Sequence, residues 1–238
     1  ADLTGINFTG VDLSGWDFSV AVLTNATLFN VNLSGAYLYA TRLDGAVVDP
    51  NTTFDDTEQD SCLYDPESDH EYIPKDDESK EEQLSKAVST YHTLEQLVAN
   101  NGLTRLQSKF FVRRQDMQRK RHWERGKYPQ YLFARLSGSV FKYGEGIARV
   151  PLWSVGVILA YAVVYAKFDL IFDGAGGFLQ DPVDAVYFST LTFTTLGFGN
   201  FQPDPASEVG RTLVTTQAAL GTILIAVFVF VLGRRAAR

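Results

Sequence analysis

The sequence has few of the residues that build metal centres, cross-links or catalytic sites. A single cysteine, Cys62, excludes an internal disulfide. Of the three histidines, His92 and His122 have no cysteine or histidine nearby at the spacing of metal ligands. We find no nucleophile motif, no paired carboxylates and no phosphate-cradling loop. These absences argue against an enzyme, and we expect no catalytic residues, no metal centre and no cofactor.

Charge is divided unevenly along the 238 residues, whose formal net charge is −7. Residues 55–82 hold thirteen acidic and two basic side chains, whereas residues 105–149 hold twelve basic and three acidic ones. The mean hydropathy is near zero because a polar first part offsets an apolar last part. Length and charge together predict a multi-domain protein. The chain begins in the middle of a repeated pattern, so we expect it to be a fragment of a longer protein.

A period of five residues runs through the first fifty residues, which fits neither a helix nor a strand. Its central positions are apolar: Leu3, Phe8, Leu13, Phe18, Leu23, Leu28, Leu33, Leu38, Leu43 and Val48. The pattern resembles the pentapeptide-repeat family, which implies a right-handed quadrilateral β-helix over residues 1–54 with four units per coil. Trp16 stands where a small residue is usual, so we expect a bulge or a boundary there. A rigid scaffold for an unidentified cytoplasmic partner is the expected role.

Residues 55–80 are rich in Asp, Glu, Ser and Pro, and we interpret them as an acidic linker that covers the end of the repeats. Residues 81–149 are interpreted as a helical adaptor and an interfacial segment. An apolar helix face ends at Asn101-Gly102, and Thr104 caps the second helix of a hairpin. The basic residues of that helix suit anionic lipid headgroups better than nucleic acid, because a membrane span follows. Aromatic residues suited to the membrane interface are Tyr128, Tyr131, Phe133, Phe141 and Tyr143.

Two apolar segments, 150–166 and 212–232, approach the length that crosses a bilayer. Basic residues precede the first segment and follow the second, so the positive-inside rule places both termini in the cytoplasm. The intervening residues 167–211 hold six acidic and two basic side chains, a negative charge that would concentrate cations outside. We therefore expect a multi-pass protein of the plasma membrane.

The residues from Thr194 to Asn200, T-T-L-G-F-G-N, lie between the two spans. Irregular backbone at membrane depth is tolerated only inside protein or along a water-filled path. Gly197 and Gly199 reach positive φ at little cost, which lets successive carbonyl oxygens point to one side. Four chains around an axis would form oxygen rings that replace the hydration shell of an alkali cation. Residues 184–194 suit a short helix whose C-terminal end faces that path.

With Tyr187 and Phe188 before it and Gly210-Arg211 after it, this string resembles the pore of the two-transmembrane potassium channels of prokaryotes. The resemblance implies an all-α pore domain over residues 150–238, with two transmembrane helices and a re-entrant pore helix. It further implies a homotetramer in the lipid bilayer with K⁺ as the permeant ion.

The resemblance also assigns residues to the site. The selectivity filter would be formed by Thr195, Leu196, Gly197, Phe198 and Gly199, with K⁺ bound from Thr195 to Phe198. The inner cavity would be lined by Ala218, Thr222, Ile225 and Val229. Gly221 would be a gating hinge, and close helix packing is an equally good explanation of that glycine.

Two positions depart from the family pattern. Asn200 replaces a residue that is usually acidic, and Leu191 replaces a glutamate that some members bury behind the filter. Three functions therefore stay open: a potassium-selective channel gated by an unknown cytoplasmic signal, a non-selective cation channel, and a membrane-anchored interaction protein with a degenerate pore. The sequence contains no array of spaced arginines that would form a voltage sensor.

Overall fold

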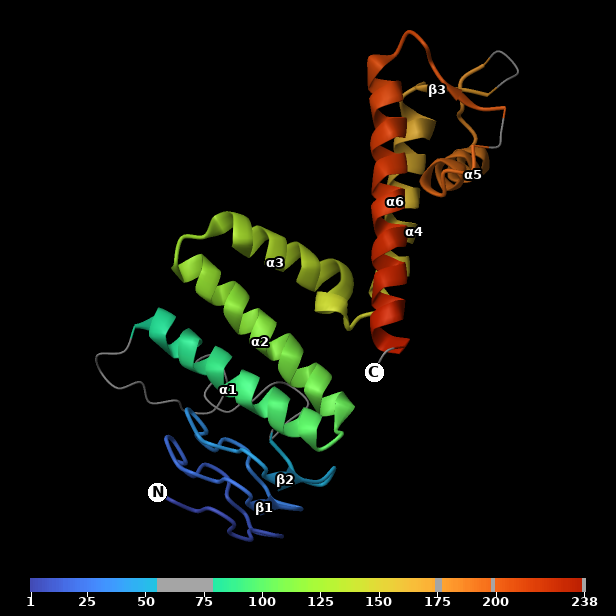
Figure 1. Cartoon of the computed structure of the whole chain (residues 1–238). Helices are drawn as coiled ribbons and strands as arrows, with labels where there is room; N and C mark the ends of the chain where they lie inside the picture. The colour runs from blue at the N-terminus through green and yellow to red at the C-terminus, as the bar shows by residue number, and fades with distance from the viewer. Residues whose placement is uncertain (55–78, 174–176, 198–199, 237–238) are drawn as a thin grey trace. The chain divides into compact units, whose positions relative to one another are not determined.

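A computed structural model of the chain describes residues 1–54, 79–173, 177–197 and 200–236. Nearly all of the predicted acidic linker, together with Phe198 and Gly199, lies outside these ranges. The chain divides into two compact units, Ala1–Gly138 and Ser139–Arg238 (Figure 1). The repeats and the helical hairpin, predicted as separate domains, thus belong to one unit.

The repeats form successive coils that pair in parallel. Strand β1 (Thr27–Leu28) pairs with β2 (Val47–Val48), Thr27 opposite Val47. Isolated parallel bridges join Asp2 to Val22 and Asp12 to Asn32, again twenty residues apart. Twenty residues equal four five-residue units. The square cross-section and the right-handed sense of the coil stay predictions.

Apolar side chains fill the interior of the coils. The central residues buried there are Leu13, Phe18, Leu23, Leu28, Leu33, Leu38, Leu43 and Val48. Outside, Asp12 Oδ1 accepts a hydrogen bond from the Ser14 N–H, and Asn7 Oδ1 accepts one from the Thr9 N–H. Such side-chain to backbone bonds stabilise tight turns. Burial inside and turn chemistry outside therefore both follow the five-residue period.

The expectation of a bulge or a boundary at Trp16 is wrong. The indole is 56% exposed and stacks on Phe18 with ring centroids 6.1 Å apart. The Tyr37 N–H donates to the Trp16 carbonyl at 2.8 Å, so the backbone stays in register with the next coil. The large ring fits because it lies outside the coil.

Helices α1 (Lys80–Asn100) and α2 (Thr104–Glu124) pack against each other and cover the last coil. The ring of Phe54 meets that of Phe110 edge-on at 5.4 Å. Asn101 Nδ2 donates to the Ala46 carbonyl at 3.1 Å, and its Oδ1 accepts from the Val48 N–H at 3.2 Å. One apolar core therefore continues from the repeats into the hairpin.

The turn between these helices corrects the predicted cap. The Gly102 N–H donates to the Ala99 carbonyl and the Leu103 N–H to the Val98 carbonyl, with Gly102 at φ 72°. This is a Schellman motif. It is so tight that Thr104 is already the first residue of α2, and Leu103 takes the N-cap position without a side-chain hydrogen bond.

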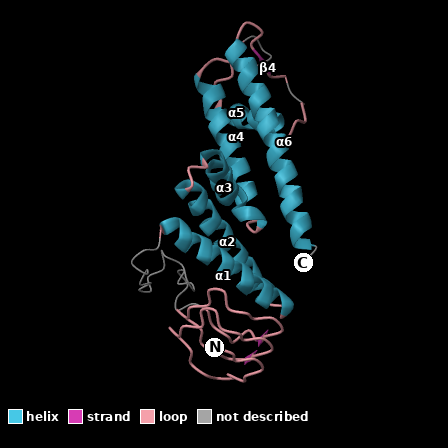
Figure 2. Ribbon diagram, turned by 60° about the vertical axis from the view of Figure 1, so that its left-hand side comes forward, coloured by secondary structure: helices cyan, strands magenta, loops and turns pink. Residues whose placement is uncertain are grey.

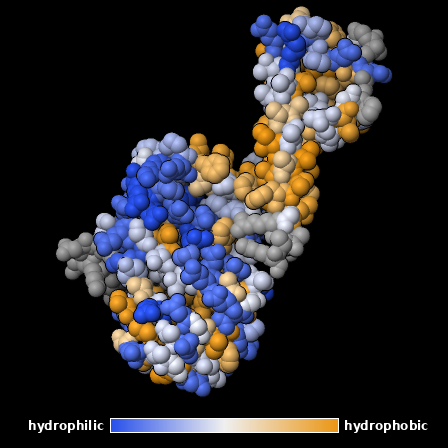
Figure 3. All heavy atoms as spheres, in the orientation of Figure 1, coloured by the Kyte–Doolittle hydropathy of each residue, from blue (hydrophilic) through white to orange (hydrophobic). Residues whose placement is uncertain are grey.

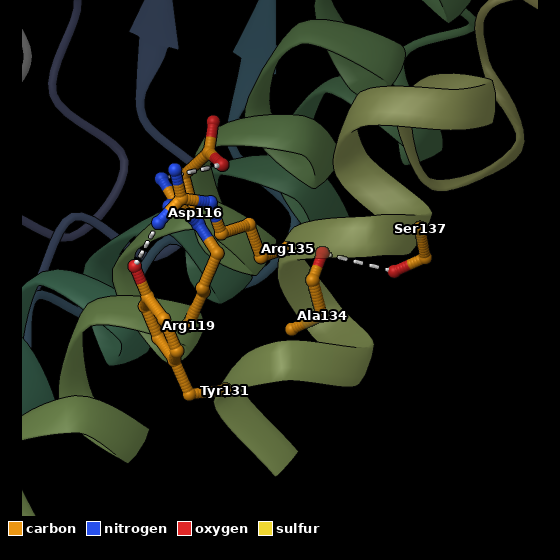
Figure 4. A network of polar contacts seen from close by, with 6 residues as sticks. All are labelled: Asp116, Arg119, Tyr131, Ala134, Arg135 and Ser137. Atoms are coloured by element: carbon orange, nitrogen blue, oxygen red, sulfur yellow. Dashed lines mark hydrogen bonds and ion pairs between the residues drawn. The ribbon is translucent and has the colours of Figure 1, made fainter. Parts of the chain in front are cut away.

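Helix α3 (Tyr128–Phe141) buries none of its residues. The ring of Trp123, on α2, meets the rings of Tyr128 and Tyr131 at 5.3 and 5.0 Å. Figure 4 shows polar contacts of α2 and α3. Arg135 donates to the Tyr131 hydroxyl at 3.1 Å on α3, and Arg119 pairs with Asp116 at 3.5 Å on α2. A short 3₁₀ helix, η1 (Lys142–Gly144), follows.

The second unit is built from α4 (Arg149–Lys167), α5 (Pro182–Phe193) and α6 (Glu208–Ala236). Helices α4 and α6 are long and apolar enough to cross a membrane, and they contain the two predicted spans. The shorter α5 packs against both (Figure 2). Beside them, β3 (Ile171–Phe172) pairs antiparallel with β4 (Gln202–Pro203).

Candidate functional site

Helix α5 has a clear start signal before the filter string. Asp181 is its N-cap and accepts a hydrogen bond from the Val183 N–H at 2.7 Å. Pro182 follows at the first helical position, where its missing N–H costs nothing, and Asp184 adds negative charge to the first turn. The helix therefore starts at Pro182, two residues before the predicted start.

The same helix ends in a Schellman motif. The Thr195 N–H donates to the Thr192 carbonyl at 3.2 Å, and the Leu196 N–H donates to the Leu191 carbonyl at 3.1 Å. Thr195 occupies the left-handed position at φ 56°, which glycine usually takes. A β-branched residue is strained there, and such strain is concentrated at functional sites.

The first three predicted filter residues follow directly and are all exposed. Thr195 and Gly197 have positive φ, 56° and 66°, and Leu196 between them does not. Thr195 Oγ1 donates to the neighbouring Thr194 carbonyl at 2.7 Å. The backbone thus alternates in handedness up to Gly197, where the described part of the filter ends.

The segment after the filter contacts both the residues that follow α4 and the helix that precedes the filter. Through the β3–β4 pair, Phe172 lies opposite Gln202, and the Asp204 N–H donates to the Leu170 carbonyl at 3.0 Å. Phe201 packs beside Phe188 of α5, ring centroids 6.1 Å apart. The residues on both sides of the filter are therefore fixed by the same small framework.

A buried polar network joins the three helices, and sequence reasoning missed it. Gln217 Nε2 of α6 donates to the Ser189 carbonyl at 3.0 Å and to Ser189 Oγ at 2.6 Å. Ser189 Oγ donates to the Ile158 carbonyl of α4 at 2.7 Å, and the Tyr165 hydroxyl donates to Gln217 Oε1 at 2.8 Å. The available signal was an amide side chain within an apolar span.

Gly221 lies against the C-terminal end of α5. A Cβ atom at this position would overlap the carbonyl oxygen of Phe193, so only glycine allows the approach. This contact supports the packing explanation of the glycine. Helix α6 is continuous through Gly221, and the gating hinge stays a prediction.

The predicted cavity residues follow one another along α6. Ala218 is half-buried, and Thr222, Ile225 and Val229 are exposed in the single chain. Asn200 is exposed as well, and Leu191 is half-buried within α5. Among the described residues, no group of His, Cys, Asp and Glu side chains could hold a metal ion.

Comparison with protein families gives two matches. Residues 153–238 match the family described as ion channel, and residues 1–38 match pentapeptide repeats in eight copies. Coil pairing in the structure continues beyond the matched repeats, to Thr53. A search of curated proteins and a search of solved structures gave no significant match.

Proposed function

We propose that this chain, which joins N-terminal pentapeptide repeats to a C-terminal ion-channel domain of the two-transmembrane type, is a subunit of a homotetrameric, potassium-selective channel. One observation carries the proposal. The string T-T-L-G-F-G-N continues directly from α5, which packs between two helices able to cross a membrane. At that depth, irregular backbone belongs beside a water-filled path.

Four subunits would bring the carbonyls of Thr195, Leu196, Gly197, Phe198 and Gly199 around one axis, where they coordinate dehydrated K⁺. The alternating φ of Thr195, Leu196 and Gly197 supports this arrangement because it turns successive carbonyls the same way. Exposure of Ile225 and Val229 on α6 agrees with a cavity lined by inner helices, whose closure would form the gate.

The same proposal places both termini in the cytoplasm of a plasma-membrane protein. The repeats, as a right-handed quadrilateral β-helix, and the helical hairpin would then receive an unknown cytoplasmic signal. On the surface of helix α3, the side chains of Leu132, Phe133 and Leu136 are 57%, 74% and 55% exposed. With basic residues such as Arg135 nearby, this side would contact the lipid interface.

Ion flux through the purified protein in liposomes tests the proposal. With a K⁺ gradient opposed by Na⁺, the reversal potential is expected to follow K⁺. Gly199→Asp should abolish the flux, and Gly197→Ala should reduce it strongly because alanine is strained at φ 66°. The matched control is Gly156→Ala, where a Cβ meets open space, and its flux should equal that of the wild type. A reversal potential that ignores the K⁺ gradient would instead indicate a non-selective cation channel.

A second candidate function is a membrane-anchored scaffold, and the outer surface of the repeats favours it. Trp16 and Val20 are 56% and 69% exposed, and Phe29 is 40% exposed. Aromatic residues are enriched in binding surfaces. Assembled tetramers that conduct no ion and still bind a soluble protein would support this function in place of the channel.

A further inference from the structure

We propose that Gln217 is a positioning residue, which holds the pore helix α5 at the depth and tilt that give the filter its preference for K⁺. The proposal rests on the proposed channel function. It extends that function by assigning a role to the buried network of Gln217, Ser189 and Tyr165. These side chains do not touch the ion, and they act through the helix that precedes the filter.

Gln217 is at the centre of this network. Its side chain is fully buried, as are those of Ser189 and Tyr165. The three side chains have four polar hydrogens, one on Tyr, two on Gln and one on Ser. Each hydrogen has an acceptor in the network. One amide group thus connects α6 with α5 directly and with α4 through Tyr165.

Removing this amide leaves polar groups without partners at membrane depth, where no water can replace them. One of the Gln217 bonds ends on the main-chain carbonyl of Ser189. A bond to the main chain fixes the helix itself, whereas a bond between two side chains fixes only their rotamers. The network therefore resists sliding and rotation of α5.

A second contact defines the register between the two helices. Gln217 and Gly221 lie one turn apart on α6, and their partners Ser189 and Phe193 lie one turn apart on α5. Two contacts a turn apart determine both the height and the rotation of one helix on another. Phe193 is only two residues before Thr195. A shift of α5 is therefore passed directly to the start of the filter.

The neighbouring residue supplies a matched control. Thr216 Oγ1 lies 3.1 Å from the Tyr161 hydroxyl, a hydrogen bond that joins α6 to α4. Gln217→Met and Thr216→Val each replace a polar side chain by an apolar one of similar size. Each removes hydrogen bonding between helices, but only Gln217→Met releases α5.

The test is the K⁺ to Na⁺ permeability ratio of the full chain in liposomes, taken from reversal potentials. Gln217→Met is expected to lower the ratio about tenfold, in the range found for hydrogen bonds between membrane helices. Thr216→Val should leave it unchanged. Gln217→Glu, neutral at this depth, keeps an acceptor for Tyr165 and one donor, and should recover part of the ratio.

A double variant tests whether Gln217 and Ser189 act together. Ser189→Ala should lower the ratio less than Gln217→Met, because the bond to the Ser189 carbonyl remains. The combined fall should be smaller than the sum of the two single falls, since each single change already removes the bond between the two side chains, while the Ser189 bond to the Ile158 carbonyl is lost only with Ser189→Ala. If Gln217→Met prevents assembly, Tyr165→Phe and Ser189→Ala are compared with Thr216→Val in the same way.

Two results would overturn the proposal. One is an assembled Gln217→Met tetramer with the wild-type ratio, and the other is an equal fall in Thr216→Val. Hydrogen exchange in residues 182–193 distinguishes failure of the positioning proposal from failure of the proposed channel function. If the wild type conducts no K⁺, the channel proposal fails, yet faster exchange in Gln217→Met would still support the positioning role. Unchanged exchange would refute it.

Discussion

The two compact units place their apolar and polar side chains in opposite ways. Inside the coils of the first unit, the buried side chains are mainly apolar, and turns with polar or charged side chains face outward. In the second unit, Leu152 and Phe230 are 72% and 61% exposed, and Gln217 is buried. Figure 3 shows apolar side chains over the long helices of this unit.

This contrast shows what holds each unit together. Water drives the leucines of the first unit inside, so its stability comes from apolar burial. Lipid is as apolar as leucine, so membrane helices are held by close approach of small residues and by polar contacts. Gly221 and Gln217 supply these two interactions on one face of α6. Substitutions should therefore act on the two units through different mechanisms.

The largest effect is expected from Gly221→Val, because any Cβ at this position overlaps the Phe193 carbonyl. We expect loss of the assembled oligomer in size-exclusion chromatography, while the far-UV signal of the repeats persists. Gly156→Val, which faces open space, is the control and should assemble normally. Normal assembly of Gly221→Val with altered opening would contradict the packing explanation and favour the gating hinge.

A smaller effect is expected from Leu28→Ala in the coil interior. Leu28 is 1% exposed, and truncation of such a leucine costs about 2–5 kcal/mol of unfolding free energy. Denaturant unfolding followed by circular dichroism would measure the loss. The comparison is Val47→Ala on the neighbouring strand, where the side chain is 36% exposed and the cost should be well below that of Leu28→Ala. Equal losses would show that the interior is not tightly packed.

Asn101→Ala should weaken the junction between hairpin and coil. The side-chain amide of Asn101 forms hydrogen bonds with the backbone carbonyl of Ala46 and the backbone N–H of Val48. A buried backbone group left unpaired costs about 1–3 kcal/mol of stability. The measurement is hydrogen exchange of the Val48 amide, which should accelerate. Asn100→Ala is exposed at the end of α1 and serves as the control. If both variants behave alike, the bridge contributes nothing to stability.

The smallest effect is a pH dependence of the first unit at His122. Burial, and then the nearby positive charges of Arg121, Lys127 and Arg125, lower the pKa of His122 below its ordinary value of 6.5. Below that pH the unfolded chain takes up the proton first, so stability should fall as the pH drops from 7 to 5. Thermal unfolding of His122→Gln should show a flatter dependence over this range, and identical profiles would exclude the effect.

Local patterns in the sequence predicted much of this molecule. The five-residue period of the leucines anticipates the coil pairing, and the apolar segments anticipate α4 and α6. The string after Thr194 indicated where α5 ends, and the ion-channel match covers it. Each of these features depends on residues close together in the chain, so its signal is visible without tertiary structure.

Contacts between distant residues could not be predicted in this way. Phe54 meets Phe110, and Tyr165 bonds Gln217, across long stretches of chain. The residues near Gln217 in the sequence do not indicate which side chain it contacts. The strained φ of Thr195 was missed for another reason, because glycine usually takes the left-handed position of a Schellman motif and threonine disfavours it.

Because one coil contains twenty residues, the number of repeats determines the length of the coil stack in fixed steps. Insertion of one whole coil would move the attached hairpin away from the first coil by one strand spacing, about 4.8 Å, without turning it. Insertion of a single five-residue unit would instead turn the hairpin by a quarter of a revolution. Changes in repeat number during evolution can therefore alter reach and orientation separately, while every leucine keeps its place inside the coil.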